Sequence, residues 1–170
     1  MNNLYTLYSL EEIEIFKNLS PKNDTIRATS KLIEISKKIP IFADIPTNIL
    51  IKILKDIQII KYKKDEIIIT ENDTDKKILF ILFGSVNIIK QTTLLTTLKK
   101  NTIIGEMASL LEEKRSASII ANEDTIIISF KIDFSLNHSS LGVYFSIIYK
   151  NLSKELAKKL LIQNNKIVNK

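Results

Sequence analysis

Between residues 57 and 130 the chain repeats one pattern: a short segment rich in β-branched residues is followed by a cluster of polar residues. Val, Ile and Thr favour strands, whereas polar clusters such as residues 71–75 favour the turns between them. Strands are predicted at 59–62, 66–70, 78–83, 86–90, 94–98, 102–104, 116–121 and 125–130. Short strands at this regular spacing predict a closed antiparallel roll or sandwich.

Helical patterns precede the strands. Residues 1–39 carry apolar side chains at helical spacing and are interrupted by a breaker at 20–24. These helices either pack on the main domain or offer an apolar face to a partner, and packing is the simpler reading. A further helix is predicted to begin near Thr47, and its apolar face would consist of Ile49, Leu50, Ile53, Leu54 and Ile57.

A longer helix is predicted after the strands, at 141–165. Its apolar stripe has i, i+4 spacing and consists of Tyr144, Ile148, Leu152, Leu156 and Leu160. We therefore expect a helical N-terminal extension at 1–39 and one main domain at 40–170. The expected fold class is mainly β with flanking helices.

The composition excludes several kinds of site. There is no Cys and only one His, so neither a thiolate zinc site, a cysteine nucleophile nor a multi-histidine metal cage is expected. His138 lies in a polar stretch and is expected to be a loop residue, not a catalytic base, so we do not expect an enzyme. The net charge of +6 is modest and does not by itself indicate nucleic-acid binding.

The sequence also bears on location. No apolar run approaches 18 residues, so no membrane span is expected. The first residues include Glu11, Glu12 and Glu14 instead of a basic start before an apolar core, so no secretory signal is expected. The cytoplasm is therefore the expected location.

One segment, between the sixth and seventh predicted strands, combines residue types that suit an anionic ligand. A one-turn helix over 107–110 would present free N–H groups to negative oxygens. Gly105 leaves room for a ligand to approach the backbone, and Arg115 offers a planar fork for two phosphate oxygens. Ser116 adds a hydroxyl group, and the anionic Glu106 would accept a hydrogen bond from a sugar hydroxyl.

Such a pocket suits a ligand with both a phosphate and a free hydroxyl, of which a cyclic ribose phosphate is the compact case. Arg115 is one of only two arginines in a chain that otherwise uses Lys, and we expect it to face the ligand, not the core. The spacing alone equally allows a surface salt bridge from Arg115 to Glu112 or Glu113, with Glu106 simply solvated.

A family resemblance rests on these residues. Gly105-Glu106-x-Ala108-x-Leu110-Leu111, followed by Arg115-Ser116-Ala117, resembles the phosphate-binding cassette of cyclic-nucleotide-binding domains. Such domains occur in catabolite-activator-type bacterial regulators, in regulatory subunits of cyclic-nucleotide-dependent kinases and in gated channels. The resemblance extends over 40–163. It implies an eight-stranded antiparallel β-roll of the double-stranded β-helix or jelly-roll type, with flanking helices.

The resemblance also implies a ligand and the residues that bind it. Glu106 would take the ribose 2′-hydroxyl and Arg115 the cyclic phosphate, while Ser116 and the backbone of Gly105, Glu106, Met107 and Ala108 would complete the cradle. Cyclic AMP is favoured over cyclic GMP, and no metal is expected. The family usually has Gly where this chain has Asp65 and Asn72, but both residue types tolerate left-handed turns.

The expected output is a contact with another molecule. The chain stops too soon after its last helix for a winged helix-turn-helix, so we expect a stand-alone sensor without DNA or membrane binding. The helix at 141–165 is expected to form a homodimer or to contact an effector protein. Asn151 and Ser153, near its middle, are candidates to reach the base. The alternative is a scaffold that retains the roll but binds no ligand.

Overall fold

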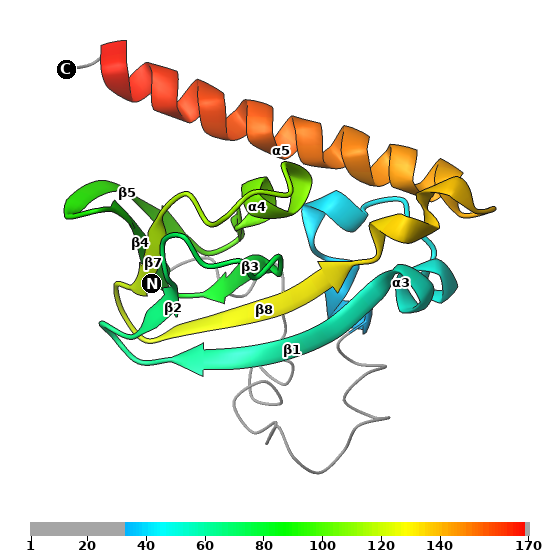
Figure 1. Ribbon diagram of the computed structural model, residues 1–170, viewed down its shortest axis with the longest axis horizontal. Coiled ribbons are helices and arrows are strands. Elements are labelled where there is room, and N and C mark those ends of the chain that lie inside the picture. Colours follow the sequence, from blue (N-terminus) through cyan, green and yellow to red (C-terminus); the bar gives the residue numbers. More distant parts are fainter. Residues whose placement is uncertain (1–32, 169–170) are drawn as a thin grey trace. The chain divides into compact units, whose positions relative to one another are not determined.

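The computed structural model describes residues 33–168 (Figure 1), so the helices predicted within 1–32 lie outside the described residues. The described chain forms two compact units. The β-roll consists of Leu54–Ile132, and the helical unit consists of residues 33–53 together with 133–168.

The β-roll contains the eight predicted strands, arranged as two four-stranded sheets. The sheet orders are β1-β8-β3-β6 and β2-β7-β4-β5, and every strand pair is antiparallel. The strands are β1 (Leu54–Tyr62), β2 (Ile67–Ile69), β3 (Ile78–Phe83), β4 (Ser85–Lys90), β5 (Thr93–Lys99), β6 (Ile103–Ile104), β7 (Ser118–Ala121) and β8 (Thr125–Ile132). The predicted eight-stranded antiparallel roll is confirmed.

Aliphatic side chains from both sheets form the core of the roll. Ile81, Val86 and Ile127 are completely buried in it, and burying an aliphatic side chain of this size contributes about 1.5–3 kcal/mol. The remaining members of this buried cluster are Ile69, Leu79, Ile104 and Ile119. Several of these strands are buried on both faces: five of the six residues of β3 and both residues of β6 are buried.

The helix predicted from Thr47 is shorter than its apolar pattern indicated. α3 (Thr47–Ile53) ends at Ile53, and Leu54 already pairs with Ile132 in β8. The strand register shifts between Lys55 and Gln58, and Asp56 adopts a φ of 51°. This irregularity interrupts the alternation of β1, so that Leu54 and Ile57 continued the helical spacing although they belong to the strand.

Two turns of the roll contain the predicted substitutes for Gly. Asp65 and Asn72 both adopt a φ of 68°, the left-handed conformation that Asp and Asn tolerate better than other residues with a side chain. Nearby, the exposed Lys63 Nζ donates to Asp124 Oδ2 at 2.8 Å and connects the β1–β2 turn to the β7–β8 turn. This hydrogen bond lowers the pKa of Asp124 and raises the pKa of Lys63.

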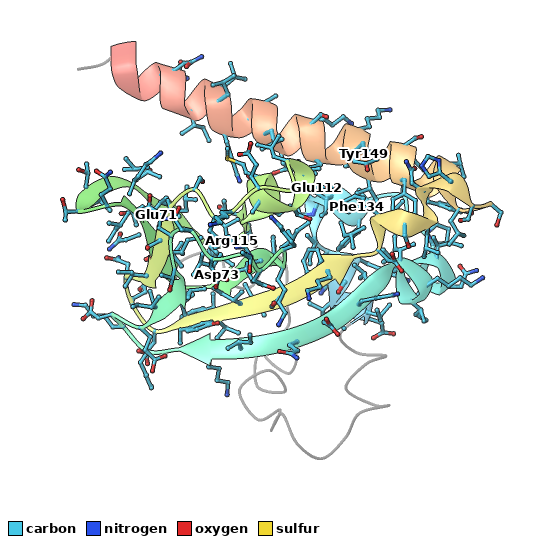
Figure 2. The ribbon with its side chains drawn as sticks, in the orientation of Figure 1. Glu71, Asp73, Glu112, Arg115, Phe134 and Tyr149 are labelled. Carbon is cyan, nitrogen blue, oxygen red and sulfur yellow. The ribbon has the colours of Figure 1, made fainter. Side chains whose placement is uncertain are left out.

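The helical unit contains η1 (Pro40–Phe42), α3, η2 (Phe134–His138) and α5 (Gly142–Val168). The predicted C-terminal helix is confirmed, and His138 ends η2 instead of lying in a loop. Phe134 in η2 lies beside Tyr149 in α5 (Figure 2), and the two rings stack with their centroids 5.7 Å apart. Of the helices within 33–168, none has a stretch long and apolar enough to span a bilayer.

The apolar stripe of α5 divides into a buried part and an exposed part. Ile148 and Leu152 are buried, Leu156 is half-buried, and Leu160 is 58% exposed. The helix therefore carries more apolar surface than its own unit buries.

Candidate ligand-binding site

The candidate site begins where β6 ends. Gly105 adopts a φ of 77° and precedes α4 (Glu106–Leu110), the short helix predicted from the sequence. A Cβ atom at position 105 would lie 2.5 Å from Arg115 Nη1 and 3.2 Å from the Lys77 carbonyl oxygen. The space that Gly105 leaves is thus occupied by the guanidinium of Arg115, where we had expected ligand.

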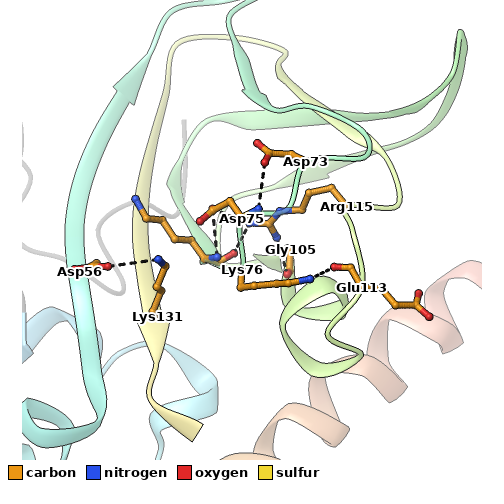
Figure 3. A network of polar contacts seen from close by, with 9 residues as sticks. Asp56, Asp73, Asp75, Lys76, Gly105, Glu113, Arg115 and Lys131 are labelled. Carbon is orange, nitrogen blue, oxygen red and sulfur yellow. Dashed lines mark hydrogen bonds and ion pairs between the residues drawn. The ribbon is translucent and has the colours of Figure 1, made fainter. Parts of the chain in front are cut away.

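Arg115 is held by acceptors of the protein itself (Figure 3). Its Nη1 donates to the Gly105 carbonyl oxygen at 2.8 Å. Its Nη2 donates to the Lys77 carbonyl oxygen at 2.7 Å and to Asp75 Oδ2 at 3.2 Å. The side chain is only 3% exposed, so it is more deeply buried than we expected. Its acidic partner is Asp75 and not Glu112 or Glu113.

Two N–H groups of this buried guanidinium have no acceptor. Arg115 Nε is inaccessible to solvent and makes no hydrogen bond. A guanidinium has five N–H groups, and the three bonds above leave Nε–H and one N–H of Nη1 available. A buried donor without an acceptor costs about 1–3 kcal/mol. An oxygen atom of an anionic ligand would remove that cost, provided that the groups that shield Nε from solvent move aside on binding.

The other predicted residues of the segment divide by exposure. Glu106, the first residue of α4, is 4% exposed, and Ala108 is also buried. Met107 and Ser116 are exposed. The first N–H groups of a helix lack acceptors within it, so α4 adds backbone donors beside the buried carboxylate. Gly105, Glu106, Met107 and Ala108 thus lie at the start of α4, and Arg115 joins them through the Gly105 carbonyl oxygen.

A second segment supports this one and was not predicted as part of the site. The Arg115 N–H donates to the Asp73 carbonyl oxygen at 2.8 Å, and the Asn72 N–H donates to the Arg115 carbonyl oxygen at 2.9 Å. Lys76 Nζ donates to the Glu113 carbonyl oxygen. The sequence pattern predicts only a turn at 71–75, because no spacing rule relates Asp75 to a residue 40 positions later.

Asn151 and Ser153 belong to the helical unit. Asn151 Nδ2 donates to the carbonyl oxygens of Ile41 and Ala43, at 3.3 and 2.9 Å. Ser153 Oγ donates to the Tyr149 carbonyl oxygen one turn earlier, at 2.8 Å. Both side chains thus make hydrogen bonds within their own unit, and their contact with a base stays a prediction.

Within residues 33–168, no group of three or more His, Cys, Asp or Glu side chains is arranged to hold a metal ion.

The positive φ of Gly105 and the position of Arg115 make one substitution informative. Gly105→Ala is expected to lower the free energy of unfolding by more than ~1 kcal/mol, because Ala is strained at this φ and its Cβ would displace the guanidinium. Urea denaturation measures this loss. The control is Ser109→Ala, on the same short helix, which should change stability little. Equal stability of both variants would contradict the described contact.

The chain resembles known proteins in sequence and in fold. Residues 59–134 match the family model of the cyclic nucleotide-binding domain. The Pycsar effector protein BcPycTIR of Burkholderia cepacia is 30% identical over 113 residues, which make up 66% of this chain and 36% of that protein. A cGMP-dependent protein kinase of Plasmodium berghei is 29% identical over 136 residues, 78% of this chain and 15% of the kinase.

A solved structure has the same fold. The crystal structure of a cyclic nucleotide-binding domain from Methylobacillus flagellatus superposes with a TM-score of 0.65, at 24% identity over 84% of each chain. Residues 59–134 thus match the model of the cyclic nucleotide-binding domain family, and the β-roll has the fold of such a domain, as the resemblance implied. The chain spans well under two thirds of either curated relative.

Proposed function

We propose that this protein is a receptor for a cyclic nucleotide, cyclic AMP or cyclic GMP. The observation that supports this most is the buried Arg115, whose Nε–H lacks an acceptor. The buried Glu106 lies in the same segment of the chain. A cyclic phosphate oxygen would accept from Nε–H, because a charge-assisted hydrogen bond to phosphate is among the stronger contacts a guanidinium makes. Glu106 would accept from the ribose 2′-hydroxyl.

The remaining residues of the segment would complete the site. Backbone N–H groups of Gly105, Glu106, Met107 and Ala108, together with the exposed hydroxyl of Ser116, would contact the phosphate. The names of related proteins favour the same ligand class, since one of them is a cGMP-dependent kinase. We favour cyclic AMP over cyclic GMP only because of the resemblance to the family as a whole.

The alternative is a scaffold that keeps the roll without ligand. Against it stands the number of contacts devoted to one side chain: Asp75, Lys77 and Gly105 all supply acceptors to Arg115. A guanidinium held in this way costs desolvation that a scaffold would not need.

Thermal unfolding with and without ligand tests the receptor proposal against the scaffold. A ligand at 100 times its Kd adds about 2.7 kcal/mol to the free energy of unfolding and raises Tm. We expect cyclic AMP or cyclic GMP to raise Tm, and the noncyclic 5′-monophosphates to have little effect. If no cyclic mononucleotide or cyclic dinucleotide raises Tm at millimolar concentration, the scaffold is the better account.

We further propose that the ligand acts by favouring one position of α5 and that the output is a protein contact. A ligand shifts such an equilibrium only by the difference between its affinities for the two states. We expect the protein to act in the cytoplasm as a regulator without catalytic activity of its own and without DNA or membrane binding. α5 would carry the signal to a second copy or to an effector protein.

A homodimer through α5 is the preferred form of this contact. Tyr149, Ser153, Leu156 and Leu160 are spaced by four, three and four residues, the alternation of a coiled-coil seam, and none is charged. Three of them are exposed and Leu156 is half-buried. A second α5 would bury this seam.

Leu156→Glu is therefore expected to dissociate the dimer, because it places a charge at a seam position. Light scattering on both proteins measures the effect. Asn165→Glu, which adds the same charge at an exposed position of the same helix, should leave the dimer intact. A wild type that stays monomeric at high concentration, with and without ligand, would rule out the dimer and leave an effector protein as the partner.

A further inference from the structure

Residues 111–114 connect α4 to Arg115 and are exposed throughout. We call this segment the arm of the cassette. Within this arm Glu112 adopts a φ of 56°. A residue with a side chain rarely adopts this left-handed conformation, and it persists only where surrounding contacts hold the backbone. The backbone of residues 111–114 therefore needs a contact from outside the segment to hold it in this conformation.

Two backbone hydrogen bonds hold the ends of the arm. At its start, the Leu111 N–H donates to the Met107 carbonyl oxygen at 2.9 Å, which joins it to α4. Just beyond its end, the Arg115 N–H donates to the Asp73 carbonyl oxygen at 2.8 Å. Between these points, a side chain reaches the arm from outside: Lys76 Nζ donates to the carbonyl oxygen of Glu113, the residue that follows Glu112 (Figure 3).

The position of Lys76 is fixed by its neighbours. Asp75 Oδ2 and the Lys77 carbonyl oxygen both accept from Arg115 Nη2. Lys76, which lies between them, is thus held beside the guanidinium, and its side chain extends to the arm. A single segment consequently positions Arg115 on one side and the arm on the other.

We propose that Lys76 is a positioning residue that clamps the arm of the cassette in its binding conformation. This inference rests on the proposed function, since it presumes that the anion binds at Arg115. Ligand affinity then depends on the fraction of molecules in which the arm is held. If loss of the clamp lowers that fraction to about 10–30%, Kd rises by about 3- to 10-fold.

The test compares Lys76→Met with Lys77→Met. Both variants remove one positive charge and keep a side chain of similar length, but only the first removes the hydrogen bond to Glu113. The contacts that the structure gives Lys77 are made by its backbone and survive the substitution. Amide hydrogen exchange of residues 112–115 is measured in the free protein, and Kd for cyclic AMP and cyclic GMP is measured by calorimetry.

We expect faster exchange of these amides and a 3- to 10-fold higher Kd in Lys76→Met, with Tm little changed and neither effect in Lys77→Met. Lys76→Arg, which keeps a cationic donor, should restore most of the affinity. The ratio of the two Met variants' Kd values should be similar at about 0.1 M and about 0.5 M salt, because a clamp acts through contact and not through long-range charge.

Two results would overturn the clamp. One is unchanged exchange of residues 112–115 in Lys76→Met. The other is an equal rise in Kd for both Met variants that disappears at high salt, since that identifies attraction by net charge. Failure of the proposed function looks different: the wild type binds no cyclic nucleotide, while the exchange comparison in the free protein still decides whether Lys76 holds the arm.

Discussion

Arg115→Ala is expected to weaken cyclic-nucleotide binding by about 2–5 kcal/mol, or about 30- to 5000-fold, because it removes the buried cation from the proposed phosphate site. It should also destabilise the roll. The Gly105 and Lys77 carbonyl oxygens lose their common donor and Asp75 loses its ion pair, and a carbonyl oxygen left buried without a donor costs about 1–3 kcal/mol. Calorimetry gives the first effect and urea denaturation the second.

A gentler variant keeps this prediction testable if Arg115→Ala does not fold. Arg115→Lys retains the charge but cannot reproduce a planar fork with several directed donors, so we expect a folded protein whose binding is clearly weaker. The control is Lys114→Ala, which removes a neighbouring exposed cation and should change Kd little. Wild-type affinity in Arg115→Lys, or in a folded Arg115→Ala, would remove Arg115 from the site.

The second large effect concerns the sugar. If Glu106 accepts from the 2′-hydroxyl, the 2′-deoxy form of the ligand leaves a buried carboxylate without that donor. The wild type should therefore bind the deoxy ligand about 5- to 150-fold more weakly than the ribose form, a difference of about 1–3 kcal/mol.

A substitution at Glu106 tests whether its side chain contacts the ribose 2′-hydroxyl. Glu106→Gln keeps an oxygen acceptor without the charge, so it should weaken binding less than Arg115→Ala and reduce the preference for ribose. Competition titration with both sugars, on both proteins, measures this. Similar Kd values of the wild type for the ribose and deoxy ligands would show that Glu106 does not contact the 2′-hydroxyl.

The sequence was informative wherever a local pattern determined the structure. The eight strands were recognisable because β-branched residues alternate with polar turns, and α4 because Gly105 precedes a short helical stretch. Asp65 and Asn72 could replace Gly because their side chains tolerate left-handed backbone. The predicted boundary between α3 and β1 was wrong, because the strand irregularity at Asp56 lets apolar residues of β1 continue the helical spacing.

The site was only partly predictable for a different reason. Residues 105, 106 and 115 lie close together in sequence, so their combination could be read directly. What surrounds Arg115 comes from residues 73–77, and this contact exists only after the roll has formed. The burial of Arg115 and its pairing with Asp75 are therefore tertiary properties, as is the division of the α5 stripe into a buried and an exposed part.

The most direct test of the account is a crystal structure of the protein with the cyclic nucleotide that raises its Tm. The account predicts a phosphate oxygen at hydrogen-bond distance from Arg115 Nε, about 2.7–2.9 Å, and a ribose 2′-hydroxyl that donates to Glu106. A ligand bound elsewhere, or a phosphate that leaves Arg115 Nε without an acceptor, would contradict the central claim.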